Sequence, residues 1–246
     1  MDEAGSAYYR DDLALVHHLG FGFHADTCAP GILALLEPVR RRRGLVLELG
    51  CGSGLLTRHL LDAGHRVIAT DASPSMLELA RRHAPEAEGI LLVALPHDPL
   101  PVADAVVSVG HVLNYLPDEA AIDRALVAAA RALRPGGLLA IDLCDLRWGE
   151  VRRDVPAQAR VTDDWVLVTE FSLPSPRRFV RAMTILVRAA DGTWRRDDER
   201  HDNVLIDTSR VPALLGEHAV EATVRRSFGA EQLPDGLVAV VGHRRS

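Results

Sequence analysis

Glycines and carboxylates with the spacing of a nucleotide-binding site lie between residues 46 and 71. An apolar segment that contains Glu48 runs into a turn with glycines at alternate positions, Gly50, Gly52 and Gly54. Asp71 follows Gly50 by 21 residues and ends a second apolar segment. Glycines let the backbone approach a ligand, and an acid at this distance can accept hydrogen bonds from ribose hydroxyls. The spacing therefore predicts a nucleoside-containing ligand at the turn.

The residues beside the glycines decide between kinds of nucleoside ligand. A dinucleotide fingerprint has a glycine at its sixth position, where this chain has Leu55. The Glu48 carboxylate would repel a pyrophosphate, but it suits a ligand that carries an ammonium and a sulfonium. These two residues argue against a nicotinamide-dependent oxidoreductase, which remains an alternative interpretation.

The segment 46–54 resembles the first motif of class I S-adenosylmethionine (SAM) methyltransferases, and the turn at 133–137 is similar to another feature of that family. The resemblance implies SAM as the cofactor and S-adenosylhomocysteine (SAH) as the product. The residues that we expect to contact the cofactor are Tyr9, Glu48, Gly50, Cys51, Gly52, Gly54, Asp71, Ala72, Met76, Leu95 and Gly110.

Residues that could contact a methyl acceptor follow the fourth predicted strand. The segment 110–116 resembles a Gly-x-Val-Leu-x-Tyr-Leu sequence of bacterial small-molecule methyltransferases, with His111 at a position that is often acidic there. His111 could orient or deprotonate the acceptor, or it could simply pack at the strand end. Asn114 and Tyr115 are further candidates, with a turn cap and a core position as the respective alternatives.

Two other segments supply acceptor candidates. His17, His18 and Phe21 lie in a stretch that resembles a His-x-x-Gly-Phe-Gly sequence of the same group, and His17 or Tyr9 could approach the cofactor carboxylate or the acceptor. Ordinary helix packing is the alternative. The stretch 195–201 resembles an Arg-Arg-x-x-Glu-x-His strand, in which Glu199 and a catalytic His201 would share one face and point into the pocket as a pair. An exposed charged strand is the alternative there, and Trp148 completes the set of expected acceptor contacts.

Expected strands and helices alternate along the chain around these residues. This alternation predicts an α/β fold: a Rossmann-like, doubly wound, mostly parallel sheet that ends in an antiparallel hairpin. We expect parallel strands at 45–49, 66–70, 90–94, 104–109 and 138–143. A helix at 211–215 and strands at 220–226 and 237–243 would complete that sheet. Helices at 7–19 and 30–36, joined by 20–24, would form an N-terminal cap.

Residues 144–210 change to strand-like alternation and predict an inserted antiparallel β lid over the acceptor pocket. Its strands are expected at 164–172, 178–188 and 193–206. A two-residue turn at Asp191-Gly192 would pair His201 with Ala182, Glu199 with Thr184 and Asp202 with Arg181. The same register sets Arg188 against Arg195, which is unfavourable, so the register stays open. The expected division is a cap at 1–44, a cofactor-binding core at 45–143, the lid at 144–210, and a return to the core at 211–246.

Composition limits the possible partners. The 246 residues include 28 Lys and Arg against 34 Asp and Glu, a formal charge of −6, which disfavours nucleic acid as a partner. The run 40–43 of four arginines suits a solvated helix end. Cys28, Cys51 and Cys144 have no metal or redox spacing, so we expect reduced thiols and no metal. Without a leader or a long apolar run, we expect a cytoplasmic protein that binds no membrane, as a monomer or homodimer.

The functional expectation is the transfer of a methyl group from SAM to an oxygen, nitrogen or carbon of a small, biosynthetic acceptor. Such a transfer is an in-line displacement, so the protein mainly aligns the acceptor and excludes water. A base matters only where the acceptor must lose a proton. The alternative is a SAM-binding protein of the same fold with a rearranging or regulatory role. The sequence leaves the acceptor open.

Overall fold

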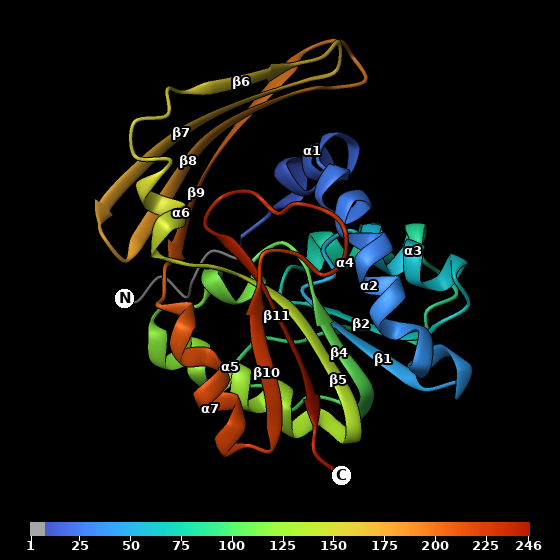
Figure 1. Cartoon of the computed structure of the whole chain (residues 1–246). Coiled ribbons are helices and arrows are strands. Elements are labelled where there is room, and N and C mark those ends of the chain that lie inside the picture. The colour runs from blue at the N-terminus through green and yellow to red at the C-terminus, as the bar shows by residue number, and fades with distance from the viewer. Residues whose placement is uncertain (1–7) are drawn as a thin grey trace.

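Seven strands form the central sheet of the computed structural model, which describes residues 8–246. Their order is β10-β11-β5-β4-β1-β2-β3, and β11 runs antiparallel to both of its neighbours (Figure 1). The strands are β1 (Leu45–Leu49), β2 (Arg66–Asp71), β3 (Gly89–Leu92), β4 (Ala103–Ser108), β5 (Leu133–Cys144), β10 (Val220–Arg225) and β11 (Leu237–Arg244). The predicted Rossmann-like sheet with a C-terminal antiparallel hairpin is confirmed.

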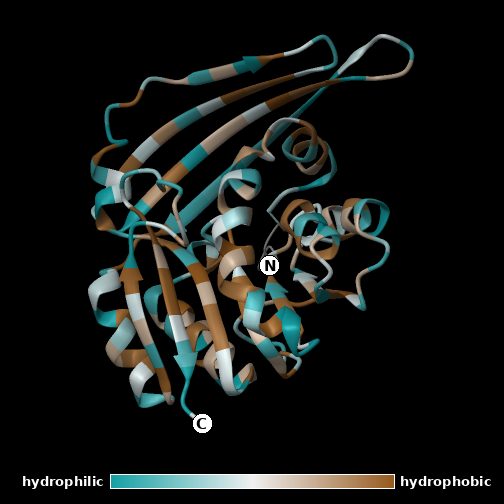
Figure 2. Ribbon diagram, turned by 45° about the vertical axis from the view of Figure 1, so that its right-hand side comes forward, coloured by the Kyte–Doolittle hydropathy of each residue, from teal (hydrophilic) through white to brown (hydrophobic). Residues whose placement is uncertain are grey.

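Helices cover both faces of this sheet, so its strands are apolar on both sides. One face packs against α2 (Phe23–Arg41), α3 (Leu55–Asp62) and α4 (Pro74–His83), and the other against α5 (Glu119–Ala132) and α7 (Val211–Glu217). Figure 2 shows the apolar colour that runs along the central strands. This packing fixes the carboxyl ends of the parallel strands at one edge, where ligands bind in this architecture.

A second sheet forms the lid above that edge (Figure 1). Its antiparallel strands, in the order β6-β7-β8-β9, are β6 (Gln158–Val161), β7 (Trp165–Ser175), β8 (Arg178–Arg188) and β9 (Trp194–Val204). Helix α6 (Leu146–Glu150) leads into the lid, and η2 (Thr208–Arg210) leads out of it. Helix α1 (Asp11–Gly20) packs beneath the lid, with Leu13 and Val16 against Trp165 and Ile185. The first helix therefore belongs to the lid side, whereas α2 belongs to the core.

The N-terminal helices differ from their predicted bounds. Helix α1 starts at Asp11, and the predicted start at Ala7 lies outside the described residues. The second helix was expected at 30–36, but α2 spans 19 residues, with Pro30 and Pro38 inside it. An internal proline removes one helical hydrogen bond and costs roughly 3 kcal/mol. Buried apolar residues along one face of α2, among them Ile32 and Leu36, offset that cost.

The predicted lid register is wrong by one residue. The hairpin between β8 and β9 turns through the three residues 190–192, with Gly192 at φ +85°, instead of two. A three-residue loop that ends in a left-handed glycine is a standard alternative to the two-residue turn. His201 therefore pairs with Arg181, Glu199 with Met183, Asp202 with Val180, and Arg188 with Trp194. The unfavourable pairing of two arginines is thereby avoided.

Two further strands, β6 and β5, differ from the prediction. Strand β6 was missed because it is only four residues long and all four are exposed, so no buried apolar face marks it. Strand β5 begins at Leu133, earlier than predicted, and its pairing with β4 shifts between Ala103 and Ala105. The turn expected at 133–137 thus lies within the bounds of β5.

Among residues 8–246, no single helix has both the length and the apolar character to cross a membrane. Helices α1 and α2 meet that test only as a pair, with a bend of 63° between them.

Candidate functional site

A cavity of about 670 Å³ lies where the carboxyl ends of the parallel strands meet the N-terminal segment and the lid. Its volume is within the range of about 300–1,000 Å³ that is usual for small-molecule sites. The wall combines the glycine turn, the ends of β2 and β4, residues of α1 and α2, and side chains from the lid side. A second cavity, of about 620 Å³ between α5 and residues 96–102, contains none of the predicted site residues.

The glycine turn forms the floor of the 670 Å³ cavity. Gly50, Gly52 and Gly54 have φ values of +65°, +54° and +82°, which side chains rarely allow. A Cβ atom at Gly50 would lie only 2.3 Å from Val112 Cγ2, so this position also requires a glycine for space. At Gly54 a Cβ atom would lie 3.3 Å from the Cα atom of Ala80 on α4. Gly54 therefore serves helix packing and does not line the cavity, whereas Gly50 and Gly52 do.

Asp71 holds the turn from the end of β2. Its Oδ2 atom accepts a hydrogen bond of 2.8 Å from Gly52 N, and Oδ1 accepts one of 2.8 Å from Ser73 N. Burial raises the pKa of Asp71, although the backbone hydrogen bonds oppose this shift. Ser73 in turn caps α4 by accepting from Met76 N. The carboxylate is thus fixed at the cavity wall between the turn and the start of α4.

Glu48 lies beneath the same turn. Thr57 Oγ1 donates a hydrogen bond of 2.7 Å to Glu48 Oε2, and the side chain is buried. Burial raises the pKa of Glu48 to about 7; the Thr57 bond opposes the shift, and the nearby Asp71 charge adds to it. A cation bound beside Glu48 would stabilise the ionised form, so this end of the cavity favours a positively charged group.

The remaining residues expected around the cofactor also line the cavity. Cys51 belongs to the floor, Gly110 to the loop after β4, and Tyr9 to the segment before α1. Ala72, Met76 and Leu95 provide an apolar wall beside Asp71. The structure thus brings together all of the predicted cofactor-contacting residues except Gly54.

His111 reaches the cavity from a backbone held in the left-handed region. Its φ is +48°, and the buried Asp142 accepts hydrogen bonds from His111 N (2.6 Å) and Gly110 N (2.9 Å). The imidazole stacks on Tyr115 at a ring distance of 5.5 Å and lies 5.5 Å from the Trp148 ring. Burial lowers the pKa of His111 to about 3, and the positive charge of Arg181 adds to that shift. His111 is therefore neutral at physiological pH.

The histidines of α1 have different surroundings. His17 lines the cavity and stacks on Phe21 at 5.9 Å, and burial lowers its pKa to about 4. His18 does not line the cavity. Its Nδ1 atom lies 3.0 Å from Ser53 Oγ, and its ring lies against His83, so it contacts the core behind the turn. The expectation that His18 contacts substrate is corrected accordingly.

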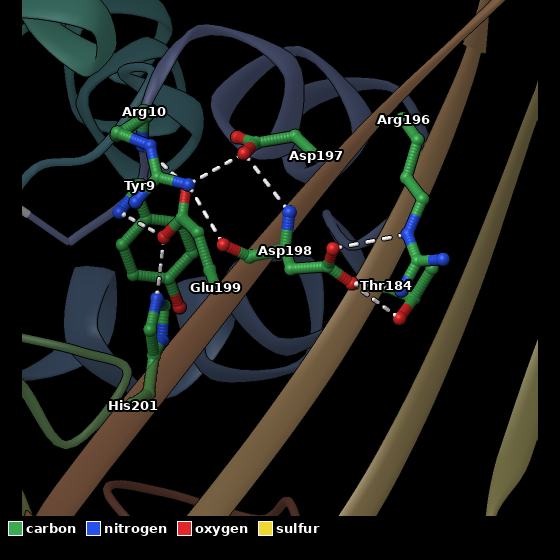
Figure 3. A network of polar contacts seen from close by, with 8 residues as sticks. All are labelled: Tyr9, Arg10, Thr184, Arg196, Asp197, Asp198, Glu199 and His201. Carbon is green, nitrogen blue, oxygen red and sulfur yellow. Dashed lines mark hydrogen bonds and ion pairs between the residues drawn. The ribbon is translucent and has the colours of Figure 1, made fainter.

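Glu199 and His201 form the expected pair, with 2.8 Å between Glu199 Oε2 and His201 Nε2 (Figure 3). Neither residue lines the cavity, so the expected contact with substrate is corrected. Glu199 accepts hydrogen bonds from the backbone nitrogens of Tyr9 (2.9 Å) and Arg10 (2.7 Å), and the His201 ring is 4.7 Å from that of Tyr9. Arg10 also donates to Asp197 Oδ1 at 2.6 Å. The pair fastens the start of α1 to the lid.

Asn114 lies in η1 (Val112–Tyr115) and is fully buried. Its amide donates to the carbonyls of Cys144 (3.1 Å) and Val204 (2.6 Å) and accepts from Cys144 N (2.9 Å). These bonds join η1, β5 and β9, and they use the polar atoms that a substrate would need. Asn114 is therefore structural, and the predicted substrate contact is corrected.

Several site residues were missed from the sequence, among them Arg181, His24 and Asp142. Arg181 of β8 and His24 of α2 line the cavity, and Asp142 of β5 supports its wall. His24 Nε2 lies 2.9 Å from Asp142 Oδ2, so the carboxylate joins this imidazole to the loop after β4. Two features of the sequence could have indicated these residues. Asp142 is an acid inside the apolar stretch 138–143, and Arg181 lies between inward-facing apolar positions of the strand 178–188.

Four buried nitrogen atoms of cavity-lining residues have no hydrogen-bond partner within the described chain. They are His17 Nδ1, His111 Nδ1, Trp148 Nε1 and Arg181 Nε. Buried polar atoms are normally hydrogen-bonded, so this wall is suited to a polar ligand. Across residues 8–246 no group of three or more His, Cys, Asp or Glu side chains is arranged to hold a metal ion.

The chain was compared with known proteins. A family model described as a methyltransferase domain matches residues 46–137. An uncharacterized methyltransferase of Mycobacterium tuberculosis is 39% identical over 127 residues, which cover 50% of this chain and 49% of the relative. A ubiquinone biosynthesis O-methyltransferase of Idiomarina loihiensis is 36% identical over 98 residues, 37% of this chain and 39% of the relative. The chain thus spans about half or less of the length of these relatives.

Solved structures match over the whole chain. The sugar N-methyltransferase KedS8 from Streptoalloteichus sp ATCC 53650 gives a TM-score of 0.77 at 22% identity, and 100% of this chain and 99% of that chain are covered. DesVI from Streptomyces venezuelae gives 0.76 at 19% identity, with 97% and 100% covered. At these identities the match shows a common fold. Residues 46–137, which include the glycine turn, therefore match a methyltransferase domain, and the whole chain shares the fold of these methyltransferases.

Proposed function

We propose that the protein transfers the methyl group of SAM to an oxygen, nitrogen or carbon atom of a small-molecule acceptor. One observation carries the proposal: a single cavity joins the glycine turn and its two carboxylates, Glu48 and Asp71, to the neutral imidazoles of His17 and His111. A cationic nucleoside suits the first end of this cavity, and an uncharged polar wall suits an acceptor at the other.

The residues at the turn fit SAM. Each Asp71 oxygen accepts one backbone hydrogen bond, which leaves lone pairs for both ribose hydroxyls. We assign Glu48 to the positive charges of the ligand, the wall of Ala72, Met76 and Leu95 to the adenine, and Tyr9, Cys51 and Gly110 to the methionine portion. When bound, the cofactor supplies an electrophilic methyl group on its sulfonium.

The lid side of the cavity can orient the acceptor and exclude water. His111, Tyr115 and Trp148 form a contiguous aromatic wall, and His17 of α1 and Phe21 just after that helix line the same cavity. We propose that this wall orients the acceptor toward the methyl group and excludes water. Two proteins with the same fold are described as a sugar N-methyltransferase and an amino pentose methyltransferase, which supports a polar small molecule as the acceptor. The net charge of −6 gives no support for nucleic acid.

We also propose a division of roles along the chain. Residues 45–143 and 211–246 would bind the cofactor, and residues 144–210 would shape the acceptor side together with the N-terminal cap, 1–44. The packing of α1 against the lid and of α2 against the core supports a cap that bridges the two parts.

Calorimetric titration with SAH, with NAD as the control ligand, tests the cofactor assignment. We expect one tight site for SAH and no heat from NAD. Incubation with SAM and a panel of small hydroxyl and amine compounds should then give a product heavier by one methyl group. Absence of SAH binding would overturn the proposal. Binding without any methylated product would favour the non-methylating alternative.

Cofactor affinity should depend on pH through Glu48. The free-state pKa of Glu48 is raised to about 7, so the site must lose a proton before it can attract a cation. We expect the dissociation constant of SAM to fall as pH rises toward 7, by at most about tenfold per pH unit, and to level off above pH 7. Titrations from pH 5.5 to 8.5, as an approximate range, measure this dependence. The isosteric Glu48→Gln variant should lose it, and an equally steep dependence in that variant would contradict the assignment.

His111 should affect turnover more than cofactor affinity. Asparagine accepts the left-handed backbone that His111 adopts, so His111→Asn tests the imidazole without straining the loop. With an acceptor found by the screen, we expect kcat to fall by roughly ten- to a hundredfold, while SAH affinity stays within about twofold. Because the pKa of His111 is about 3, the wild-type rate should show no inflection from this residue between about pH 5 and 8. An unchanged kcat would show that alignment by the other wall residues suffices.

A further inference from the structure

Arg181 places a positive charge inside the cavity. It lies on β8 opposite His201, and it lines the cavity together with Tyr9 and Tyr115. Its Nη2 atom donates a hydrogen bond to Tyr115 Oη and lies 3.4 Å from His201 Nδ1, and its guanidinium carbon is 5.7 Å from the centre of the Tyr115 ring. These neighbours are hydroxyl and imidazole groups that carry no negative charge.

No acidic side chain of the described residues forms an ion pair with Arg181. Its Nε atom is buried without a hydrogen-bond partner. Arg178, three residues earlier on the same strand, lies 3.9 Å from Asp202 and donates to Pro117 O, on the outside of the cavity. A guanidinium that loses hydration inside a cavity without gaining a counter-charge is unfavourable, and the hydrogen bond to the neutral Tyr115 hydroxyl compensates only in part.

The groups around Arg181 do not supply the missing negative charge. Burial raises the pKa of Tyr115 well above its ordinary value, so its hydroxyl stays protonated. The Arg181 charge contributes to lowering the pKa values of His17 and His111, which keeps both imidazoles neutral. Arg181 itself remains a cation, since guanidinium groups keep their proton in proteins and its pKa stays above the ordinary value despite its burial.

The cavity is therefore polarised from one end to the other. Glu48 and Asp71 lie at the glycine turn, and Arg181 lies at the lid. A ligand, or a pair of ligands, with a positive group near the turn and a negative group near the lid would match this distribution. Such a negative group could form the paired, bidentate hydrogen bonds that a guanidinium prefers, and it could also engage the free Nε atom.

We propose that Arg181 is an anion-binding residue, and that it pairs with a carboxylate or phosphate group of a molecule bound in the cavity. This assignment rests on the proposed function in one respect: the anion belongs either to the acceptor or to the methionine carboxylate of the cofactor. In both cases the lid contributes a charge that selects ligands. Neutral acceptors would then be methylated only where the cofactor supplies the anion.

The first experiment compares SAH with 5′-methylthioadenosine, an adenosine thioether that lacks the amino-acid carboxylate. Both ligands are titrated into the wild type, Arg181→Gln and the matched control Arg178→Gln. If Arg181 binds the cofactor carboxylate, Arg181→Gln should lose roughly ten- to a hundredfold in SAH affinity and keep its affinity for 5′-methylthioadenosine. The control should bind both ligands as the wild type does.

The second experiment tests the acceptor as the source of the anion. Thermal stabilisation of the SAH complex by benzoate and by inorganic phosphate is measured for the same three proteins. If the anion belongs to the acceptor, at least one of these probes should stabilise the wild type and the control, but not Arg181→Gln. Arg181→Lys, which keeps the charge without the planar fork, should respond partially.

The outcomes separate the two proposals. If wild-type protein binds neither SAH nor 5′-methylthioadenosine, the proposed function fails, and the benzoate and phosphate arms, run on the unliganded protein, still test Arg181. If SAH binds but Arg181→Gln matches Arg178→Gln with every ligand and probe, the anion site is overturned and the methyltransferase assignment stands. Far-ultraviolet circular dichroism checks that each variant is folded before it is scored.

Discussion

Replacing Asp71 by alanine should weaken SAH binding by roughly ten- to a hundredfold while leaving the protein folded. Removal of one charge-assisted hydrogen bond typically costs about 1.5–3 kcal/mol, and the ribose would lose such bonds. The structure adds a second reason. Asp71 also accepts from Gly52 N and Ser73 N, so the alanine variant loosens the turn that faces the ligand. The sheet and its helices do not depend on these contacts, and calorimetry with SAH measures the loss.

Two further variants make the Asp71 result interpretable. Asp62→Ala removes a mostly exposed carboxylate of α3 that pairs with Arg58, so it matches the change in net charge without touching the cavity. Its SAH affinity should equal that of the wild type. Asp71→Asn keeps the shape and one carbonyl oxygen, and it should fall between the two. Wild-type affinity in Asp71→Ala would mean that the ribose is held elsewhere.

The cofactor end of the site could be predicted because its signals are local in the sequence. Each of Gly50 and Gly52 needs a positive φ, and the strand that precedes them sets where the turn lies. Asp71 ends the neighbouring parallel strand, so a fixed spacing was enough to place it beside the turn. Hydrophobic strands buried on both faces likewise allowed the doubly wound, mostly parallel sheet to be predicted.

The acceptor end depends on contacts that no local pattern encodes. Arg181 reaches the cavity through the position of the lid, and Asp142 supports the cavity wall from within β5. Each lies far in sequence from the histidines it affects. The lid register depended on whether the hairpin loop has two residues or three. The expected clash of Arg188 with Arg195 was a valid warning, because the real loop removes it. Asn114 looked like a ligand contact because burial cannot be read from a polar residue alone.

Replacing Asp142 by alanine should cause the largest loss of stability among these variants. Asp142 is fully buried, and it accepts hydrogen bonds from Gly110 N and His111 N and contacts His24 Nε2. Alanine would leave three partly buried polar groups without this partner, each at a cost of up to about 1–3 kcal/mol. Because such costs do not simply add, we expect the free energy of unfolding to fall by about 3–5 kcal/mol in urea titrations.

The Asp142→Ala substitution should reduce function as well as stability, because Asp142 holds the backbone that carries His111. Without it the left-handed conformation at His111 has no support, so SAH affinity and turnover should fall together. Asp142→Asn keeps one carbonyl oxygen but turns an amide N–H toward a backbone N–H, so it should retain part of the stability. Asp98→Ala is the matched control, since Asp98 is exposed and accepts only from Ala94 N. If Asp142→Ala were as mild as that control, the loop after β4 would be held by its own packing, and His111 would not depend on the buried carboxylate.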